Sequence, residues 1–193
     1  MRDKKKFALN FAAQVAVLGS QFIISFVLTP IVLQKLGDEA YGFVGLVNNF
    51  VSYVAIITAA LNAMASRFIT VSYHGGRTDD AEEYFSSVFF SNCVMAIAIL
   101  VGSVFLAVNI DTLVSVAPEL VTDLRITVLL AFLNAGISLL TVVFGVAAFI
   151  KNELFLNSVG QLFGSVLRVV FLFVLFWAAL PHMWYFSVAG LAG

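Results

Sequence analysis

Apolar residues in this chain gather into long stretches that are separated by short polar segments. A helix needs about 20 residues to cross the hydrocarbon core of a bilayer. Five stretches meet that length and a sixth begins near the end, at residues 7–33, 41–69, 84–108, 124–150, 155–180 and, incompletely, 183–193. Spans of this kind must be helical, because lipid offers no partner to an unpaired backbone group. The pattern therefore predicts an all-α, polytopic transmembrane helix bundle.

The polar segments between the stretches are short, so we expect consecutive helices to pack antiparallel. Residues 35–38 (KLGD) are typical of a tight turn, and Pro30 just before them is expected to end or kink the first helix. Residues 75–78 (GGRT) indicate a second turn. Four acidic residues follow this turn and favour the N-terminus of the next helix: Asp79, Asp80, Glu82 and Glu83.

Composition agrees with a membrane protein and argues against a nucleic-acid partner. Hydrophobic residues make up 62% of the chain and charged residues 11%, against a usual charged share of about 25%. The net charge of −1 provides no basic field that would recruit nucleic acid, so no nucleic-acid partner is expected. The single cysteine, Cys93, excludes an intramolecular disulfide and is best interpreted as a small buried hydrophobe.

The distribution of basic residues predicts the orientation. Four basic residues precede the first apolar stretch, which is too long for a signal peptide and is interpreted as an uncleaved helix. Arg67, Arg77 and Lys151 fall on the same side as this tail, whereas the 109–123 segment holds no Lys or Arg. The positive-inside rule therefore places the N-terminus in the cytoplasm.

Four of the predicted helices carry polar or small residues on one face at 100° per residue. The members are Asn10, Gln14, Gln21 and Ser25 on the first helix; Asn48, Ser52, Ala55, Ala59, Asn62 and Ser66 on the second; Thr127, Asn134, Ser138, Thr141 and Gly145 on the fourth; and Asn157, Gln161, Gly164 and Arg168 on the fifth. Two interpretations stay open: polar contacts between packed helices, and a hydrated interior.

Arg168 is the polar residue that packing explains least well. It lies about 13 residues, or about 20 Å, from either end of the fifth span, too far for its side chain to reach a headgroup easily. Every Asp and Glu lies in a loop or at a helix boundary. Either a segment outside this chain neutralises Arg168, or the residue faces a watery cavity that receives an anion, and a guanidinium suits phosphate well.

The remaining charged and titratable residues suggest no enzyme chemistry. Arg67 lies near a span end, where anchoring to headgroups is favoured over a role in collecting an anionic headgroup at the cytoplasmic mouth. His74 and His182 lack the Cys, His or carboxylate neighbours of a metal site. We expect no catalytic residue, no metal and no cofactor.

Several segments resemble a known family. Residues 28–30 (LTP) through 35–37 (KLG), then 39–42 (EAYG), resemble the first-loop pattern of polysaccharide-export flippases. The basic N-terminal tail, the 67–69 (RFI) exit from the second helix and the spacing of the spans are also similar. These O-antigen flippase-like proteins belong to the multidrug/oligosaccharidyl-lipid/polysaccharide exporter superfamily. The resemblance extends over essentially the whole chain.

The resemblance implies two six-helix lobes around a central cavity in the bacterial cytoplasmic (inner) membrane. It implies that undecaprenyl-pyrophosphate-linked oligosaccharide moves from the cytoplasmic to the outer leaflet for polysaccharide or lipopolysaccharide biosynthesis. Basic cavity residues would meet the pyrophosphate, and Arg168 is the position that matches. Residues 1–193 are then expected to form the N-terminal lobe, truncated in its sixth helix, with the C-terminal lobe missing.

The sequence therefore predicts a membrane transporter that also contacts membrane lipids. The candidate substrate-binding residues are Arg168, Gln161, Asn157, Asn48, Asn62, Gln14, Gln21 and Asn134, with Arg67 at the cytoplasmic mouth. One alternative is a cation-coupled multidrug exporter of the same superfamily, although the spans hold no carboxylate for the ion. Others are a non-catalytic membrane subunit and a membrane-embedded enzyme, which would need a general base or metal ligands near an interface.

Overall fold

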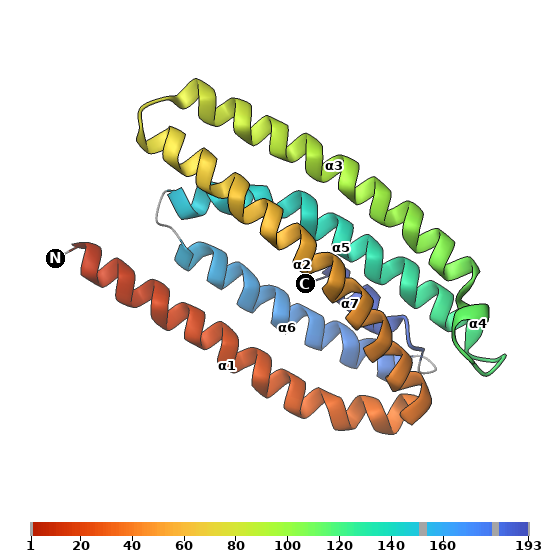
Figure 1. Cartoon of the computed structure of the whole chain (residues 1–193). Helices are drawn as coiled ribbons and strands as arrows, with labels where there is room; N and C mark the ends of the chain where they lie inside the picture. The colour runs from red at the N-terminus through yellow and green to blue at the C-terminus, as the bar shows by residue number, and fades with distance from the viewer. Residues whose placement is uncertain (1, 151–153, 179–181, 193) are drawn as a thin grey trace.

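The protein is all-α in a computed structural model that describes residues 2–150, 154–178 and 182–192 (Figure 1). Within these residues there is no strand. The helices are α1 (Arg2–Leu36), α2 (Asp38–His74), α3 (Thr78–Val108), α4 (Ile110–Leu113), α5 (Val121–Ile150), α6 (Leu154–Ala178) and α7 (Tyr185–Ala192).

The five long apolar stretches each form a helix long enough to span a membrane, as the sequence predicts. Most of these helices extend several residues beyond the apolar stretch; α2, for example, continues to His74. The reason is that hydropathy marks only the part of a helix that suits hydrocarbon, while polar flanking residues continue the helix into the interface. The sixth stretch, predicted as an incomplete helix over residues 183–193, forms α7. The short α4 was not predicted.

The turn between α1 and α2 consists of the single residue Gly37. Its φ of 82° lies in the region that favours glycine, and its N–H donates to the carbonyl of Leu33 at 2.9 Å. Pro30 was expected to end or kink the first helix; an end at Pro30 is wrong, because α1 continues to Leu36, while a kink there stays a prediction. Membrane helices tolerate an internal proline when neighbouring helices and local adjustments satisfy the freed backbone groups.

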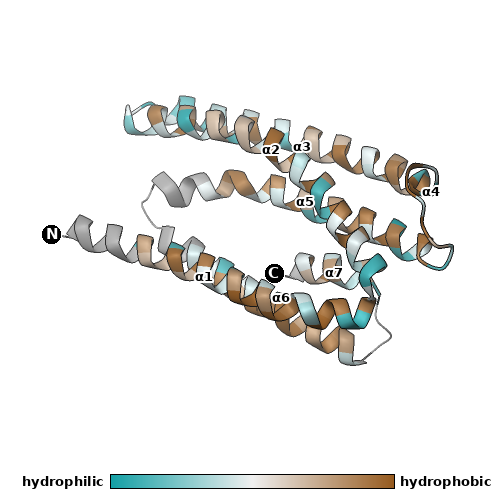
Figure 2. Cartoon of the chain, turned by 60° about the horizontal axis from the view of Figure 1, so that its bottom comes forward, coloured by the Kyte–Doolittle hydropathy of each residue, from teal (hydrophilic) through white to brown (hydrophobic). Residues whose placement is uncertain are grey.

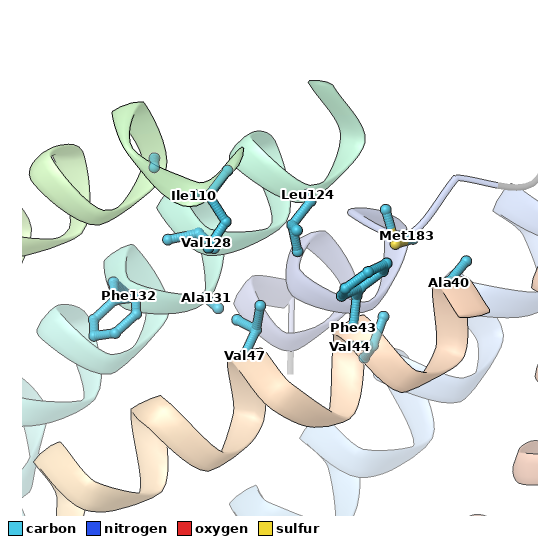
Figure 3. Packing of buried hydrophobic residues seen from close by; sticks show 11 residues of the cluster. Ala40, Phe43, Val44, Val47, Ile110, Leu124, Val128, Ala131, Phe132 and Met183 are labelled. Atoms are coloured by element: carbon cyan, nitrogen blue, oxygen red, sulfur yellow. The ribbon is translucent and has the colours of Figure 1, made fainter. Parts of the chain in front are cut away.

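The helices form two groups that meet at α7 (Figure 1). α2, α3 and α5 pack against one another, while α1 packs along α6. The first group shares a core with α4 and with Met183, which lies two residues before α7. Figure 3 shows the side chains of this core pointing toward one another: Ala40, Phe43, Val44, Val47, Ile110, Leu124, Val128, Ala131, Phe132 and Met183. The second core joins α1, α6 and α7 through Leu28, Val32, Leu172, Phe176, Tyr185 and Ala189.

The long helices are rich in apolar residues along their length (Figure 2), and many of these residues are exposed on the outside of the bundle. Large side chains there are exposed, including Phe26 at 85% and Trp177 at 93%. A water-soluble protein rarely presents such a continuous apolar surface. Surrounding lipid would cover it at no cost, so the fold is that of a polytopic membrane protein.

Both ends of the bundle are defined by their turns (Figure 1). We call the end that holds the α2–α3 turn and the start of α1 the Gly76 end, and the end that holds the α1–α2 turn and α4 the Gly37 end. Two polar contacts at the Gly37 end fasten α5. Arg125 Nη2 donates to Asp111 Oδ1 at 3.1 Å, and His182 Nδ1 lies 2.8 Å from Asp123 Oδ2.

Candidate functional site

Two cavities that open to the surface of the bundle lie beside α6, and several of their lining side chains, Arg168 among them, are exposed. Cavity A, of about 380 Å³, lies between α2, α5, α6 and α7. Its polar lining residues are Asn48, Thr58, Asn62, Thr127, Asn134, Ser138, Arg168 and Ser187. Cavity B, of about 410 Å³, lies between α1, the first turn of α2, α6 and α7. Its polar lining residues are Gln21, Ser25, Thr29, Tyr41, Ser165 and Arg168.

Arg168 lines both cavities. It lies 10 residues before the end of α6, about 15 Å from the Gly37 end along the helix. Within the described residues, its guanidinium makes no hydrogen bond or ion pair with the protein. A guanidinium carries five N–H donors and stays charged. Arg168 therefore presents an uncompensated positive charge at the boundary of two cavities.

Half of the polar side chains in cavity A are engaged by the protein itself. The Oγ1 atom of Thr58 donates to the carbonyls of Val54 and Ala55 at 3.1 Å. The side chain of Asn62 donates to the carbonyl of Thr58, that of Thr127 to the carbonyl of Asp123, and that of Ser187 to the carbonyl of Thr127. All but one of these hydrogen bonds stay within one helix; the bond from Ser187 to Thr127 joins α7 to α5.

A buried asparagine joins three helices. Asn92, on α3, is 3% exposed, and its Nδ2 donates to Asn62 Oδ1 on α2 and to the carbonyl of Leu139 on α5, both at 3.0 Å. The sequence analysis did not single out Asn92, because the third helix shows no polar stripe. The signal that was available is an amide near the middle of a helix that is otherwise apolar.

The other polar side chains of cavity A keep their hydrogen-bonding groups available. Asn48, Asn134 and Ser138 make no side-chain hydrogen bond within the described residues. Asn134 lies against α7 so closely that a Cβ atom on Gly190 would be 2.7 Å from its Nδ2 atom. Glycine at this position therefore lets α7 approach the amide that faces the cavity.

The structure brings together five of the residues predicted for the site. Asn48, Asn62, Asn134 and Arg168 line cavity A, and Gln21 joins Arg168 in cavity B. Residues of the stripes on α2 and α5 line this common space, cavity A.

Other predicted residues lie elsewhere. Gln14 and Gln161 are exposed and line neither of these two cavities, and Arg67 is exposed on α2 toward the Gly76 end, away from both. The side chain of Asn157 lies outside the described residues. The sequence analysis missed Thr29, Tyr41 and Ser165, since Thr29 follows the first stripe by one turn and the other two fall outside any stripe.

No group of three or more His, Cys, Asp or Glu side chains in the described part of the chain has the arrangement of a metal site. The chemistry that the cavities offer is recognition. A guanidinium can form charge-assisted, bidentate hydrogen bonds with a phosphate or carboxylate. Amide and hydroxyl side chains beside it can bind the polar substituents of an anionic molecule.

The fold and the cavities define the class of this protein as a polytopic membrane protein with a cationic site. The chain is similar to the "Uncharacterized membrane protein EpsK" of Bacillus subtilis (strain 168), with 31% identity over 188 residues. The aligned region covers 97% of this chain and 37% of that relative, so the chain spans little more than a third of the relative's length. No family model and no solved structure matches the chain.

Proposed function

We propose that this chain forms part of a flippase that moves lipid-linked oligosaccharide across the bacterial cytoplasmic membrane for polysaccharide or lipopolysaccharide biosynthesis. The observation that carries the proposal is the uncompensated guanidinium of Arg168, which lines two cavities of an apolar bundle. An isolated charge at such depth is costly. A transported anion would offset that cost each time it enters.

The chemistry of cavity A supports undecaprenyl-pyrophosphate-linked oligosaccharide as the substrate. A pyrophosphate presents several anionic oxygens to a guanidinium, which binds such groups bidentately. Asn48, Asn134 and Ser138 line the same cavity and can exchange hydrogen bonds with sugar hydroxyls. The apolar outer faces of α1 and α6 would remain in contact with the polyprenyl chain and membrane lipids.

We further propose that residues 1–193 act as the N-terminal lobe and that a second, C-terminal lobe completes the transport path. The greater length of the EpsK relative, of which the chain spans 37%, supports this proposal. Rocking of the two lobes would then expose the cavity to the cytoplasm and to the external side in turn.

The proposal is tested with the full-length protein in proteoliposomes that contain a fluorescent polyprenyl-pyrophosphate oligosaccharide. Transport is measured as the fraction of fluorophore that a membrane-impermeant quencher can reach. We expect Arg168→Ala to abolish transport while membrane insertion remains intact, and Arg77→Ala, which removes an exposed surface arginine, to have no effect. Unchanged transport in Arg168→Ala would contradict the proposal, and efflux of a cationic dye by the same vesicles would favour a drug exporter instead.

A further inference from the structure

Cavity B differs from cavity A in how its polar side chains are used. Of its six polar lining residues, only Ser165 makes a side-chain hydrogen bond within the described part of the chain, from Oγ to the carbonyl of Gln161 at 2.7 Å. Gln21, Ser25, Thr29, Tyr41 and Arg168 have none there. In cavity A, by contrast, the protein engages half of the polar set. The donors of cavity B are therefore available to a ligand.

The helices place these donors in one row. Gln21, Ser25 and Thr29 follow one another at intervals of four residues, so they lie on one face of α1 and extend over about 12 Å. α1 and α6 pack along each other and run in the same direction, which brings Arg168 beside this row. Tyr41, in the first turn of α2, closes the row toward the Gly37 end.

We propose that cavity B is a second binding site, which takes a phosphate-bearing headgroup in the half of the membrane nearer the Gly37 end. Arg168 would bind the phosphate, since it is the cationic residue among the described residues that line the cavity. The hydroxyls of Ser25, Thr29 and Tyr41 would donate to the remaining phosphate oxygens, and the amide of Gln21 would bind a hydroxyl-bearing substituent.

The sharing of Arg168 gives this site a role in transport. Because the guanidinium of Arg168 lines both cavities, it can bind an anion in either one, and neither cavity needs a second cationic residue. The positive-inside rule places the Gly37 end outside. Cavity B would then receive the headgroup on the external side of Arg168, as an exit site between α1 and α6. This role as an exit site rests on the proposed function, whereas the binding itself does not.

Binding is measured by protection of a thiol in each cavity. Ser25→Cys reports on cavity B and Ser138→Cys on cavity A, each in the full-length protein with Cys93→Ser and any other cysteine removed. The protein is placed in phosphatidylcholine nanodiscs, and the rate of reaction with N-ethylmaleimide is measured. One arm adds inorganic pyrophosphate to the buffer, and the other incorporates polyprenyl pyrophosphate into the nanodisc.

We expect polyprenyl pyrophosphate, present at about ten times its dissociation constant, to slow the reaction at position 25 about tenfold, because the thiol reacts only while the site is empty. Arg168→Gln should abolish this protection, Arg168→Lys should retain part of it because the charge remains, and Arg77→Gln should leave it unchanged. Equal protection by inorganic pyrophosphate would support the site and identify a soluble phosphate compound as its ligand.

Protection that is confined to position 138, or protection at position 25 that survives Arg168→Gln, would overturn the inference. If Arg168→Gln does not fold, the comparison of Arg168→Lys with the unsubstituted protein decides, because equal protection in both would exclude bidentate binding. The two proposals fail separately. Protection at position 25 without transport contradicts the flippase alone, while transport without this protection contradicts the second site alone.

Discussion

Asn92 and Arg168 both lie within membrane-spanning helices, but their hydrogen bonding differs. Asn92 is buried and donates to two helices at once, so its desolvation is compensated. Arg168 lies beside open space and has no protein partner among the described residues. The first arrangement stabilises the fold, and the second is typical of a residue that is kept for a ligand.

The stabilising role of Asn92 leads to a prediction. Asn92→Ala should lower the free energy of unfolding by about 1–2 kcal/mol, because the substitution removes two hydrogen bonds and leaves a carbonyl and an amide oxygen without their donor. The measurement is unfolding by SDS in mixed micelles, followed by circular dichroism. Ser91→Ala, on the exposed face of the same helix, is the matched control. Equal unfolding curves for the two variants would mean that the Asn92 contacts contribute nothing.

The sequence predicts part of the candidate site at this scale. The helical spacing of Asn48, Asn62 and Asn134 was enough to place them on facing surfaces, and an arginine in mid-span is conspicuous in any hydropathy profile. Gln161 shares the stripe of Arg168 but lines neither cavity, because a stripe spans a wider angle than a cavity opening. Which stripe residues face a cavity depends on helix rotation and crossing, and these are set by packing between helices.

At the scale of elements, the turns were the most predictable features after the spans. Residues 35–38 were predicted as a tight turn, and in the structure Gly37 alone separates two helices. The continuation of α1 through Pro30 was not predictable from local preference, because tertiary packing in the membrane overrides the cost of a proline. The short α4 was not predicted either, because a helix of four residues is too short to show a helical pattern of apolar positions.

The conformation of the Gly37 turn can be tested by a substitution that adds one methyl group. With φ 82° and ψ 165°, Gly37 occupies a region that is essentially restricted to glycine, so Gly37→Ala should destabilise the protein by about 1–3 kcal/mol. Gly45→Ala serves as the control, because Gly45 lies within α2 and an added Cβ meets no atom within 4 Å. The control should be neutral or stabilising in the same SDS titration. A Gly37→Ala variant as stable as Gly45→Ala would show that the turn relaxes without strain.

At the scale of the whole molecule, two helix groups with separate apolar cores leave both cavities between them. The α2, α3 and α5 group is tied by Asn92, while α1 and α6 form the other side. Both groups contact α7, which therefore borders both cavities through Phe186. The number of spans followed from the order of apolar and polar stretches along the chain, but this division into two groups did not, because it depends on contacts between residues distant in sequence.

Orientation is a property of the whole molecule and is predicted from charge. If the Gly76 end is cytoplasmic, a thiol in the 109–123 segment should react from outside the cell. We expect Ser115→Cys, with Cys93→Ser, to react with a membrane-impermeant maleimide in intact cells. Thr78→Cys, at the start of α3, should react only after the membrane is permeabilised. The opposite pattern would invert the predicted topology and place cavity B on the cytoplasmic side.

The central claim is that the charge and shape of Arg168 serve substrate movement. The most direct measurement is surface polysaccharide in cells whose only copy of the full-length protein carries Arg168→Lys, Arg168→Gln or the surface control Arg77→Gln, at equal levels of inserted protein. We expect full export with Arg77→Gln, reduced export with Arg168→Lys and none with Arg168→Gln, because only the last removes the charge from both cavities. Normal export in the Arg168→Gln cells would contradict this claim.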